Sequence, residues 1–286
     1  MKRKLILAGF VCILFSTGCN IQRMGVNMAT PMLGDLMDKM MRLKSARLAE
    51  EGLPSNLLLI SALVEFSPKN KELLTIASQA YASYGLFKED ENPAFASEIY
   101  LIGKGYGFKA LKLNSKFRKG TNEGKKPTDL VHYFGKKDVP TLFWVGMNWG
   151  QFINLNKSEP RALIDIPNVI ALMQRCVELD EGFYYGGPHL FFAAYYAGLP
   201  PIMGGGPKKA FVSFKKAFKA SGGKFLLPYV FFARYYTTLI KDEELFEKTL
   251  KKVLDTPSDI LPEAYLANEM SKKKARFYLK SKDRYF

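Results

Sequence analysis

The sequence is poor in the residue types that most often carry metal or acid–base chemistry. Its 286 residues include only 2 His and 3 Cys, against 22 Phe and 15 Tyr. The two histidines, His132 and His189, lie far apart and belong to no local cluster of histidine or cysteine, so neither a metal site nor a cofactor is expected. No Gly-x-Ser-x-Gly turn occurs and no nucleophile stands beside a base. The sequence therefore nominates no catalytic residue and predicts a protein that is not an enzyme.

The sequence also lacks an apolar run long enough to cross a membrane. A transmembrane helix needs about 20 apolar residues, whereas the run near the start, residues 5–15, has 11. Basic residues precede this run and Ser16-Thr17-Gly18-Cys19 follows it, a pattern typical of lipoprotein signal peptides, although Ser16 stands where leucine is usual. We therefore expect residues 1–18 to be a signal peptide and Cys19 to carry the lipid that anchors the protein to a membrane.

The three cysteines leave no pair for a disulfide in the mature chain. Cys12 would leave with the signal peptide and Cys19 would carry lipid, so Cys176 would stand alone. No nucleic-acid partner is expected either, since the chain is exported and has no recognisable nucleic-acid-binding motif. We expect a tether over residues 19–29 and a helical domain over residues 30–286.

Acidic residues are scarce relative to basic ones. Asp and Glu together number 27 against 42 Lys and Arg, which gives a formal net charge of +15. One interpretation is a lysine-rich, solvated surface. The other is attraction to anionic lipid head groups or to an acidic partner. The sequence alone leaves both open.

Strand-like alternation is absent, and apolar residues recur instead at helical spacing. Ile166, Val169, Ile170 and Met173 form one such stripe. Proline and glycine clusters separate the helical segments. A polar, basic segment at residues 116–126 is expected to be a mobile loop. The sequence predicts an all-α protein with helices over residues 30–50, 54–66, 70–86, 93–113, 139–156, 165–179, 187–198, 207–220, 226–240, 242–254 and 262–280.

Spacing in the C-terminal half resembles the tetratricopeptide (TPR) pattern, in which small residues stand where paired helices touch. Ala210, Phe214 and Ala217 have the spacing of the second helix of a repeat. Tyr229 and Ala233, with Tyr236 after them, have the spacing of the first helix of the next repeat. We therefore predict degenerate TPR-like helical hairpins that form one compact helical domain.

Glycines inside two predicted helices indicate close approach of another element. Gly103-x-Gly105-x-Gly107 follows no strand and lacks the spacing of a phosphate loop, so it favours close helix packing. The helix at 139–156 is apolar almost all round, which is typical of a central helix, yet it carries Gly146 and Gly150. Each costs about 1 kcal/mol relative to alanine in a helix. Their shared face indicates either a close helix crossing or the wall of a cavity.

A cavity beside Gly146 and Gly150 would be flanked by the helix at 139–156 and the aromatic helix at 187–198. An aromatic stripe on a helix more often belongs to the hydrophobic core than to a binding site. His189 has a second interpretation, as a structural histidine whose hydrogen bonds are satisfied within the fold. Under the cavity interpretation, the candidate lining residues are Asn148, Trp149, Gln151, Phe152, His189, Phe192 and Tyr196.

Several stretches resemble, in order and spacing, the T component of TPR-protein-associated TRAP transporters. The resemblance covers about residues 50–286. The stretches that carry it are Pro68-Lys69-Asn70-Lys71-Glu72-Leu73-Leu74, Ala80-Tyr81-Ala82-Ser83-Tyr84, Pro140-Thr141-Leu142-Phe143-Trp144, Trp149-Gly150, Glu178-Leu179-Asp180-Glu181, Gly187-Pro188-His189-Leu190, Leu266-Ala267-Asn268 and Lys274-Ala275, with Phe286 at the end.

The resemblance implies a lipid-anchored accessory protein that faces a bacterial periplasm and partners a periplasmic TRAP solute-binding protein. It further implies a hydrophobic pore or groove for a hydrophobic, anionic ligand, and self-association into trimers. The alternative function is a TPR-type adaptor that joins proteins in the cell envelope and binds no small molecule. A through-going apolar cavity would favour the first function, and a solid core beside an exposed groove would favour the second.

The lipid anchor gives the first testable prediction. Each buried CH2 of an acyl chain contributes about 0.8 kcal/mol, so two or more chains on Cys19 hold a protein stably on a membrane. We expect Cys19→Ala to move the protein from the membrane pellet to the soluble fraction after cell fractionation. Retention of this variant in the pellet would mean that the anchor lies elsewhere.

Overall fold

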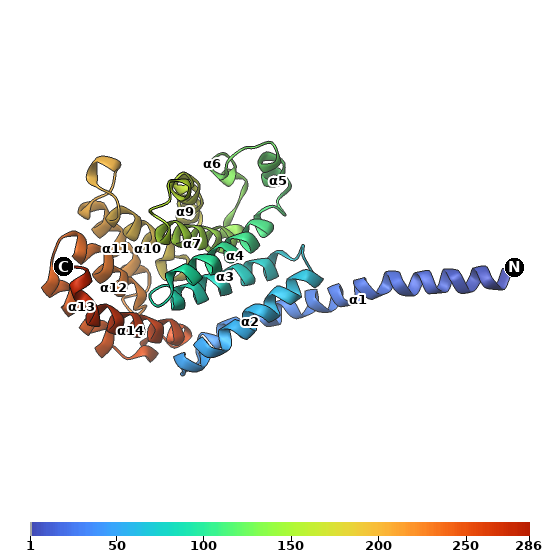
Figure 1. Ribbon diagram of the computed structural model, residues 1–286, viewed down its shortest axis with the longest axis horizontal. Coiled ribbons are helices and arrows are strands. Elements are labelled where there is room, and N and C mark those ends of the chain that lie inside the picture. The colour runs from blue at the N-terminus through green and yellow to red at the C-terminus, as the bar shows by residue number, and fades with distance from the viewer. Residues whose placement is uncertain (1) are drawn as a thin grey trace.

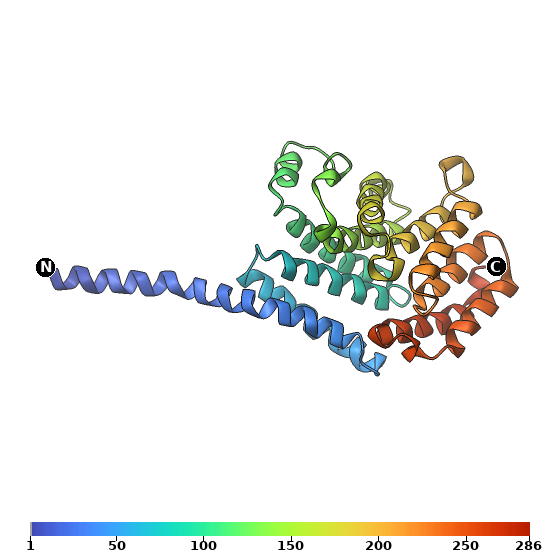
Figure 2. The ribbon, with the colours of Figure 1, turned by 180° about the vertical axis from the view of Figure 1, so that it is seen from behind.

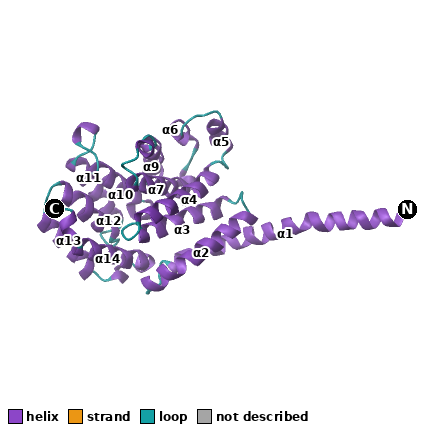
Figure 3. Cartoon of the chain, in the orientation of Figure 1, coloured by secondary structure: helices purple, strands orange, loops and turns teal. Residues whose placement is uncertain are grey.

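A computed structural model describes residues 2–286 of the chain, with side chains from residue 21 onward. Within that part every regular element is a helix and no strand occurs, which confirms the all-α prediction (Figure 3). Among the described side chains, no helix is both long and apolar enough to cross a membrane. Cys19 lies where side chains are not described, so its lipidation stays a prediction.

Helix α1, Lys2–Met40, projects from the body as one long rod (Figures 1 and 2). Its C-terminal part packs on α2, Ala46–Phe66, and on α3, Lys71–Lys88, where Val26 and Thr30 are buried. Asn70 donates a hydrogen bond of 2.9 Å to the side chain of Asn27. Residues 19–29, which were expected to form a tether, thus continue the helix, and their last residues contact the body.

The break between the first two helices lies at residues 41–45 rather than near Pro54. Ser45 caps α2 by accepting a hydrogen bond of 3.2 Å from the backbone N–H of Leu48, and Pro54 stays inside the helix. A proline inside a helix costs about 3 kcal/mol. Burial of Leu53 and Leu57 against the body offsets that cost.

The helices of the body pack mainly on their neighbours in sequence. Helix α3 packs on α4, α4 on α7, α7 on α9, and α10 on α11. The last helix, α14, returns to contact α2, so the C-terminal helices meet the N-terminal ones at one side of the body (Figure 1). The bounds of these and the remaining helices are α4 Pro93–Leu111, α5 Ser115–Asn122, α6 Pro127–Leu130, α7 Val139–Leu155, α8 Pro160–Leu163, α9 Ile166–Asp180, α10 Phe183–Ala197, α11 Pro207–Ala220, α12 Leu227–Phe231, a π-helical segment Phe232–Thr237, α13 Glu243–Asp255 and α14 Tyr265–Lys280.

Helix starts follow local capping chemistry. Asn70, Asn92 and Asp242 each accept a hydrogen bond from a backbone N–H in the first turn of α3, α4 and α13. A side-chain cap of this kind contributes about 1 kcal/mol because it satisfies an amide that has no partner within the helix. These boundaries lie close to those predicted from the sequence.

The glycines of α4 permit it to lie directly against its neighbours. A Cβ on Gly103 would collide with the side-chain amide of Asn148 on α7. A Cβ on Gly107 would collide with Val145 of α7 and would meet Ser78 of α3 at 2.8 Å. The glycine run therefore serves close helix packing, as the sequence indicated.

The segment at 116–126 contains helix α5, where a loop was expected. Asn114 caps this helix by accepting hydrogen bonds from the N–H groups of Lys116 and Phe117. Phe117 is fully buried, and its ring centroid lies 5.1 Å from that of Phe134. One buried aromatic side chain thus anchors a segment whose overall composition is that of a loop.

The contact between α10 and α11 gives the second prediction. Ala210, Phe214 and Ala217 are all fully buried, as the small-residue spacing requires. Ala210→Trp should overpack this contact and lower the free energy of unfolding by roughly 1–3 kcal/mol in urea titrations. Val212→Trp is the matched control, because Val212 on the same helix is 52% exposed. Equal stability of the two variants would contradict the packing described.

Candidate functional site

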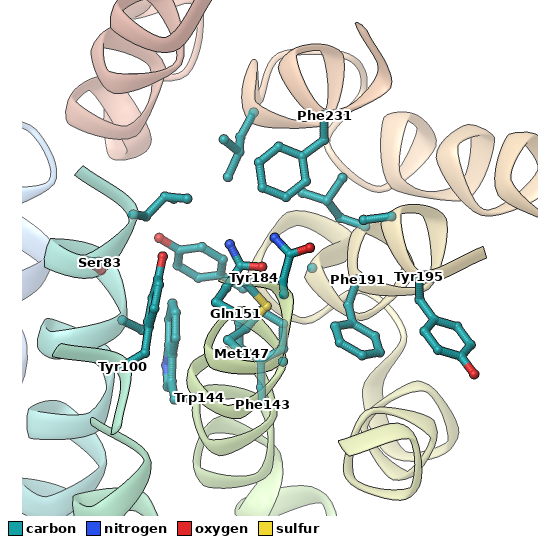
Figure 4. Close-up of a pocket in the computed structure, with 18 of the residues that line it drawn as sticks. Ser83, Tyr100, Phe143, Trp144, Met147, Gln151, Tyr184, Phe191, Tyr195 and Phe231 are labelled. Carbon is teal, nitrogen blue, oxygen red and sulfur yellow. The ribbon is translucent and has the colours of Figure 1, made fainter. Parts of the chain in front are cut away.

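A cavity of about 410 Å³ lies where helices from both ends of the chain converge (Figure 4). Its volume is within the range of small-molecule sites, which are concave and mostly apolar with a few polar groups. The apolar lining comes from the end of α1 and from α2, α3, α7, α9, α10, α12 and α14. Cavities of this kind hold ligands chiefly by removing apolar surface from water.

One face of α7 runs the length of the cavity. Phe143, Trp144 and Met147 line it near the start of the helix, and Gln151 and Asn154 line it near the end. The i, i+3 and i+4 spacing of these residues places them on a single face. The lining of α7 therefore gains two amide side chains toward the end of the helix, where Ile153 also lines the cavity.

The two glycines of α7 serve the two purposes that the sequence left open. A Cβ on Gly146 would lie 3.0 Å from the sulfur of Met173 on α9, so Gly146 allows a close helix crossing. Gly150 lines the cavity, and a Cβ there would lie 2.9 Å from the ring of Phe191 on α10. The close crossing and the cavity wall are thus adjacent on one helix.

A strained turn at the start of α10 positions aromatic side chains in the wall of the cavity. Tyr184 and Tyr185 have φ values of 47° and 58°, in the left-handed region, and Gly186 follows with 79°. A non-glycine residue in this region costs roughly 1–2 kcal/mol. The turn sets Tyr184 against Trp144, with ring centroids 4.8 Å apart, and both rings line the cavity. Strain of this kind often accompanies functional sites.

The polar edge of the cavity is tied to a buried carboxylate behind it. Tyr100 donates a hydrogen bond of 2.7 Å to Glu89 Oε2, and Gln151 Nε2 donates one of 2.9 Å to the same oxygen. Burial, with the nearby charge of Glu89, raises the pKa of the Tyr100 hydroxyl well above its usual range. The hydroxyl therefore stays protonated and remains a donor.

An ammonium group from the C-terminal helix completes this cluster. Lys274 is 3% exposed, and its Nζ lies 2.8 Å from Glu89 Oε1 and 2.5 Å from Asp90 Oδ2. Burial alone would lower the pKa of Lys274, but the two carboxylates outweigh it and hold the pKa above its ordinary value. Tyr278 donates a further hydrogen bond of 3.0 Å to Asp90. The cluster joins α14 to the end of α3.

The π-helical segment brings a second polar group to the cavity. A π-helical turn shifts the register of side chains that follow it and is frequently found at functional sites. Here it brings Tyr235 to the lining, where its hydroxyl accepts a hydrogen bond of 3.5 Å from Asn154. Arg234, the residue before it, packs over the ring of Tyr285 at 4.3 Å.

The cavity reaches the surface beyond the end of α7. Lining residues in this region are exposed: Leu163 at 39%, Met203 at 66%, and Lys157. Lys157 is exposed as a whole, but partial burial of its ammonium group, and then repulsion from Arg234, lower its pKa. The mouth therefore combines apolar side chains with positive charge.

Of the candidate residues on α7, Gln151 lines the cavity and three others do not. Asn148 donates hydrogen bonds of 2.9 and 2.8 Å to the carbonyl groups of Ser78 and Trp144. Trp149 packs on Phe108 of α4, under the ammonium of Lys104, which lies 3.8 Å from its ring. Phe152 packs against the neighbouring apolar cluster. The expected lining is corrected here, because a helix apolar all round gives no sign of which face meets the cavity.

The same correction applies to the three candidates on α10. His189 is 6% exposed and its Nε2 lies 3.0 Å from Glu181 Oε2, which agrees with the structural interpretation. Phe192 and Tyr196 stack on each other at 5.8 Å and lie outside the lining. The cavity is lined instead by a face of α10 that includes Leu190, Phe191, Ala194 and Tyr195.

Several lining residues had no signal in the sequence. Tyr184 depends on a left-handed turn between two tyrosines, a conformation that favours glycine or asparagine. Tyr235 depends on a π-helical turn inside an otherwise ordinary helical pattern.

Six lining residues are methionines, whose flexible side chains adapt to ligands of varied shape. They are Met37, Met40, Met41, Met147, Met203 and Met270.

The described side chains offer neither a metal-ion site nor a reactive thiol. No three His, Cys, Asp or Glu residues there lie close enough together to hold a metal ion. Cys176 is fully buried, and burial raises the pKa of its thiol far above the ordinary value, so it stays protonated and unreactive.

A family model for the TRAP transporter T-component matches residues 44–286. The chain therefore belongs to the T-component family of TRAP transporters, as the resemblance implied. Membership associates the protein with a TRAP transport system of the cell envelope, in a family of accessory transport proteins rather than enzymes. No curated protein matches the chain.

The buried cluster behind the cavity gives the third prediction. Lys274→Met would leave Glu89 and Asp90 without their ammonium partner, and removing one member of a buried ion pair costs about 3–5 kcal/mol. We expect a loss of that size in the free energy of unfolding. Lys273→Met is the matched control, because Lys273 is 37% exposed at its side chain and should contribute about 1 kcal/mol or less. Similar losses in both variants would contradict a special role for Lys274.

Proposed function

We propose that this protein is a lipid-anchored, periplasm-facing accessory protein that binds or channels a hydrophobic, anionic ligand beside the solute-binding protein of its TRAP system. The observation that carries the proposal is the apolar cavity enclosed by α7, α10 and the C-terminal helices. Family membership supports the link to transport. The proposal assigns the protein no catalytic role, in keeping with a family of accessory transport proteins.

The energetics of such a cavity suit transfer better than storage. An eight-carbon chain would gain about 6 kcal/mol on burial, at roughly 0.8 kcal/mol per CH2. Association costs at least about 4 kcal/mol in lost freedom. The net affinity for a short chain is therefore low, so a ligand would enter and leave readily and pass to or from a partner.

The rim of the cavity suits contact with a protein partner. Ile202 is 95% exposed and Ile164 is 68% exposed. They are the sequence neighbours of Met203 and Leu163, which line the mouth. Exposed apolar residues grouped at an opening favour a protein contact, and the periplasmic solute-binding protein of the TRAP system is the partner that the proposal assigns to this rim. Self-association into trimers is a further part of the proposal.

The test is whether an apolar ligand occupies this cavity. The full chain, purified from membranes and then incubated with fatty or aromatic acids, should bind them, and native mass spectrometry detects the bound acid as added mass. Ala194→Trp should fill the cavity and abolish that mass, because Ala194 lines it. Ala197→Trp, three residues along the same helix and outside the lining, should retain the ligand. Absence of bound or exchangeable apolar ligand on the unchanged protein would overturn the proposal and favour the adaptor function.

A further inference from the structure

Basic side chains crowd one short segment of the body. Residues 109–137 contain nine Lys and Arg against two Asp and Glu, so nearly half of the chain's formal net charge of +15 lies in this segment. All nine basic side chains are exposed to solvent. This set of nine side chains is termed the basic surface.

Most of the basic surface has no counter-charge beside it. Its one close carboxylate is Glu123, which lies 3.3 Å from Lys125 Nζ and 4.0 Å from Lys119 Nζ. Among the described residues, no Asp or Glu oxygen lies within 4 Å of the charged nitrogens of the other seven side chains. Helix α13 differs, because its charges alternate in sign and Glu247 pairs with Lys251. Crowded charges of one sign repel each other, so an anionic partner would stabilise the basic surface.

The segment that carries the basic surface is packed rather than loose. A Cβ on Gly120 would lie 2.5 Å from the side chain of Leu130, so α5 lies directly against α6. The amide of Asn114 donates a hydrogen bond of 3.2 Å to the carbonyl oxygen of Tyr133. The basic side chains therefore project from a support that holds them together on one part of the body.

Hydrogen bonds and an ion pair place this support beside the base of α1. Asn70, at the start of α3, donates a hydrogen bond of 2.9 Å to Thr30 of α1. The next residue, Lys71, pairs with Asp138, which directly follows Lys137 of the basic surface. The basic surface thus lies at the end of the body from which α1 projects, as Figure 1 shows for α5.

The expected lipid anchor lies a short way along α1 from this end. Cys19 precedes Asn27, which contacts Asn70, by eight residues of helix. At 1.5 Å per residue this is about 12 Å, which is comparable with the Debye length of about 8–10 Å near physiological salt. Ile21 and Met24 are 63% and 59% exposed, and apolar side chains gain by entering the interface of a bilayer. Their entry would bring the body still closer to the lipid head groups.

A second basic helix lies elsewhere on the body. Helix α11 carries five lysines and no acidic residue, but Figure 1 shows it toward the opposite end of the body from the projecting part of α1. An acidic protein could bind either basic region. The basic surface differs from α11 in lying where an anchor at Cys19 would bring a bilayer, and this position favours lipid over protein as its partner.

We propose that the basic surface docks on the anionic lipid head groups of the bilayer that carries the anchor. Lysine and arginine side chains within a Debye length of such a surface are attracted to it. An acyl anchor alone leaves the body free to pivot about Cys19, whereas a second contact holds it in one orientation. The inference goes beyond the proposed function, because it does not depend on what the cavity binds.

The experiment measures which lysines a bilayer protects. The full chain is placed in nanodiscs of phosphatidylcholine alone or of an equimolar mixture with phosphatidylglycerol, and is treated with acetic anhydride. Mass spectrometry gives the acetylation rate of each lysine. Lys112, Lys116 and Lys126 should react at least about threefold more slowly on the anionic discs, while Lys208 and Lys215 of α11 should react equally on both. Added sodium chloride should remove the protection, because it shortens the Debye length.

Matched variants test whether the basic surface acts as a unit. The variant Lys112→Gln/Lys116→Gln/Lys126→Gln should abolish most of the protection of Lys119 on anionic discs, because the body loses the charges that hold it at the bilayer. The control variant removes the same charge from α11, as Lys208→Gln/Lys215→Gln/Lys219→Gln, and should leave Lys119 protected. Thermal unfolding of both variants checks that the fold is intact.

Equal acetylation of Lys112, Lys116 and Lys126 on the two kinds of disc would overturn the proposal and leave the basic surface to solvent or to an acidic protein. Equal protection of the α11 lysines would also overturn it, since that result means attraction without a preferred face. If the protein does not stay with neutral discs, the anchor at Cys19 fails, yet protection on anionic discs still supports the docking surface. Ligand binding in the cavity is measured separately, so neither result decides it.

Discussion

The buried ion cluster of Lys274, Glu89 and Asp90 is the interaction on which the arrangement of the site depends. It joins the last helix to the end of α3 across 185 residues of sequence. A buried ammonium between two carboxylates tolerates little displacement, because any lost contact leaves an uncompensated charge. The same cluster holds Tyr100 and Gln151, so it fixes the polar wall of the cavity at the point where the two ends of the chain meet.

Two departures from regular helix contribute side chains to the wall of the cavity. The left-handed turn at Tyr184 and Tyr185 redirects the start of α10, and the π-helical segment displaces Tyr235 toward α7. Both departures cost free energy, and the aromatic contacts of Tyr184 with Trp144 and Phe143 help to offset that cost.

The all-α class and most helix boundaries could be predicted from the sequence because they depend on local chemistry and periodicity, whereas the family followed from a resemblance of motifs in order along the chain. Asn92 followed by Pro93 marks a helix start wherever the helix lies in the fold. The sequence also predicted that the helices at 139–156 and 187–198 flank a cavity, from their aromatic content and from Gly146 and Gly150. Of the individual lining residues, Gln151 was predicted, while Asn148, Trp149 and His189 face other parts of the core.

Sequence by itself determined most of the helical segments and which of them are apolar enough to lie at the centre, since each property is a sum over neighbouring residues. It did not determine the break at residues 41–45 or helix α5, which depend on contacts with the body. Tertiary structure alone decided which face of α7 meets the cavity, because a helix apolar all round can be rotated without changing its pattern. It also decided that Lys274 lies beside Glu89 and Asp90. Pairings between charges distant in sequence depend on how whole helices pack, and this packing cannot be read from the periodicity of each helix.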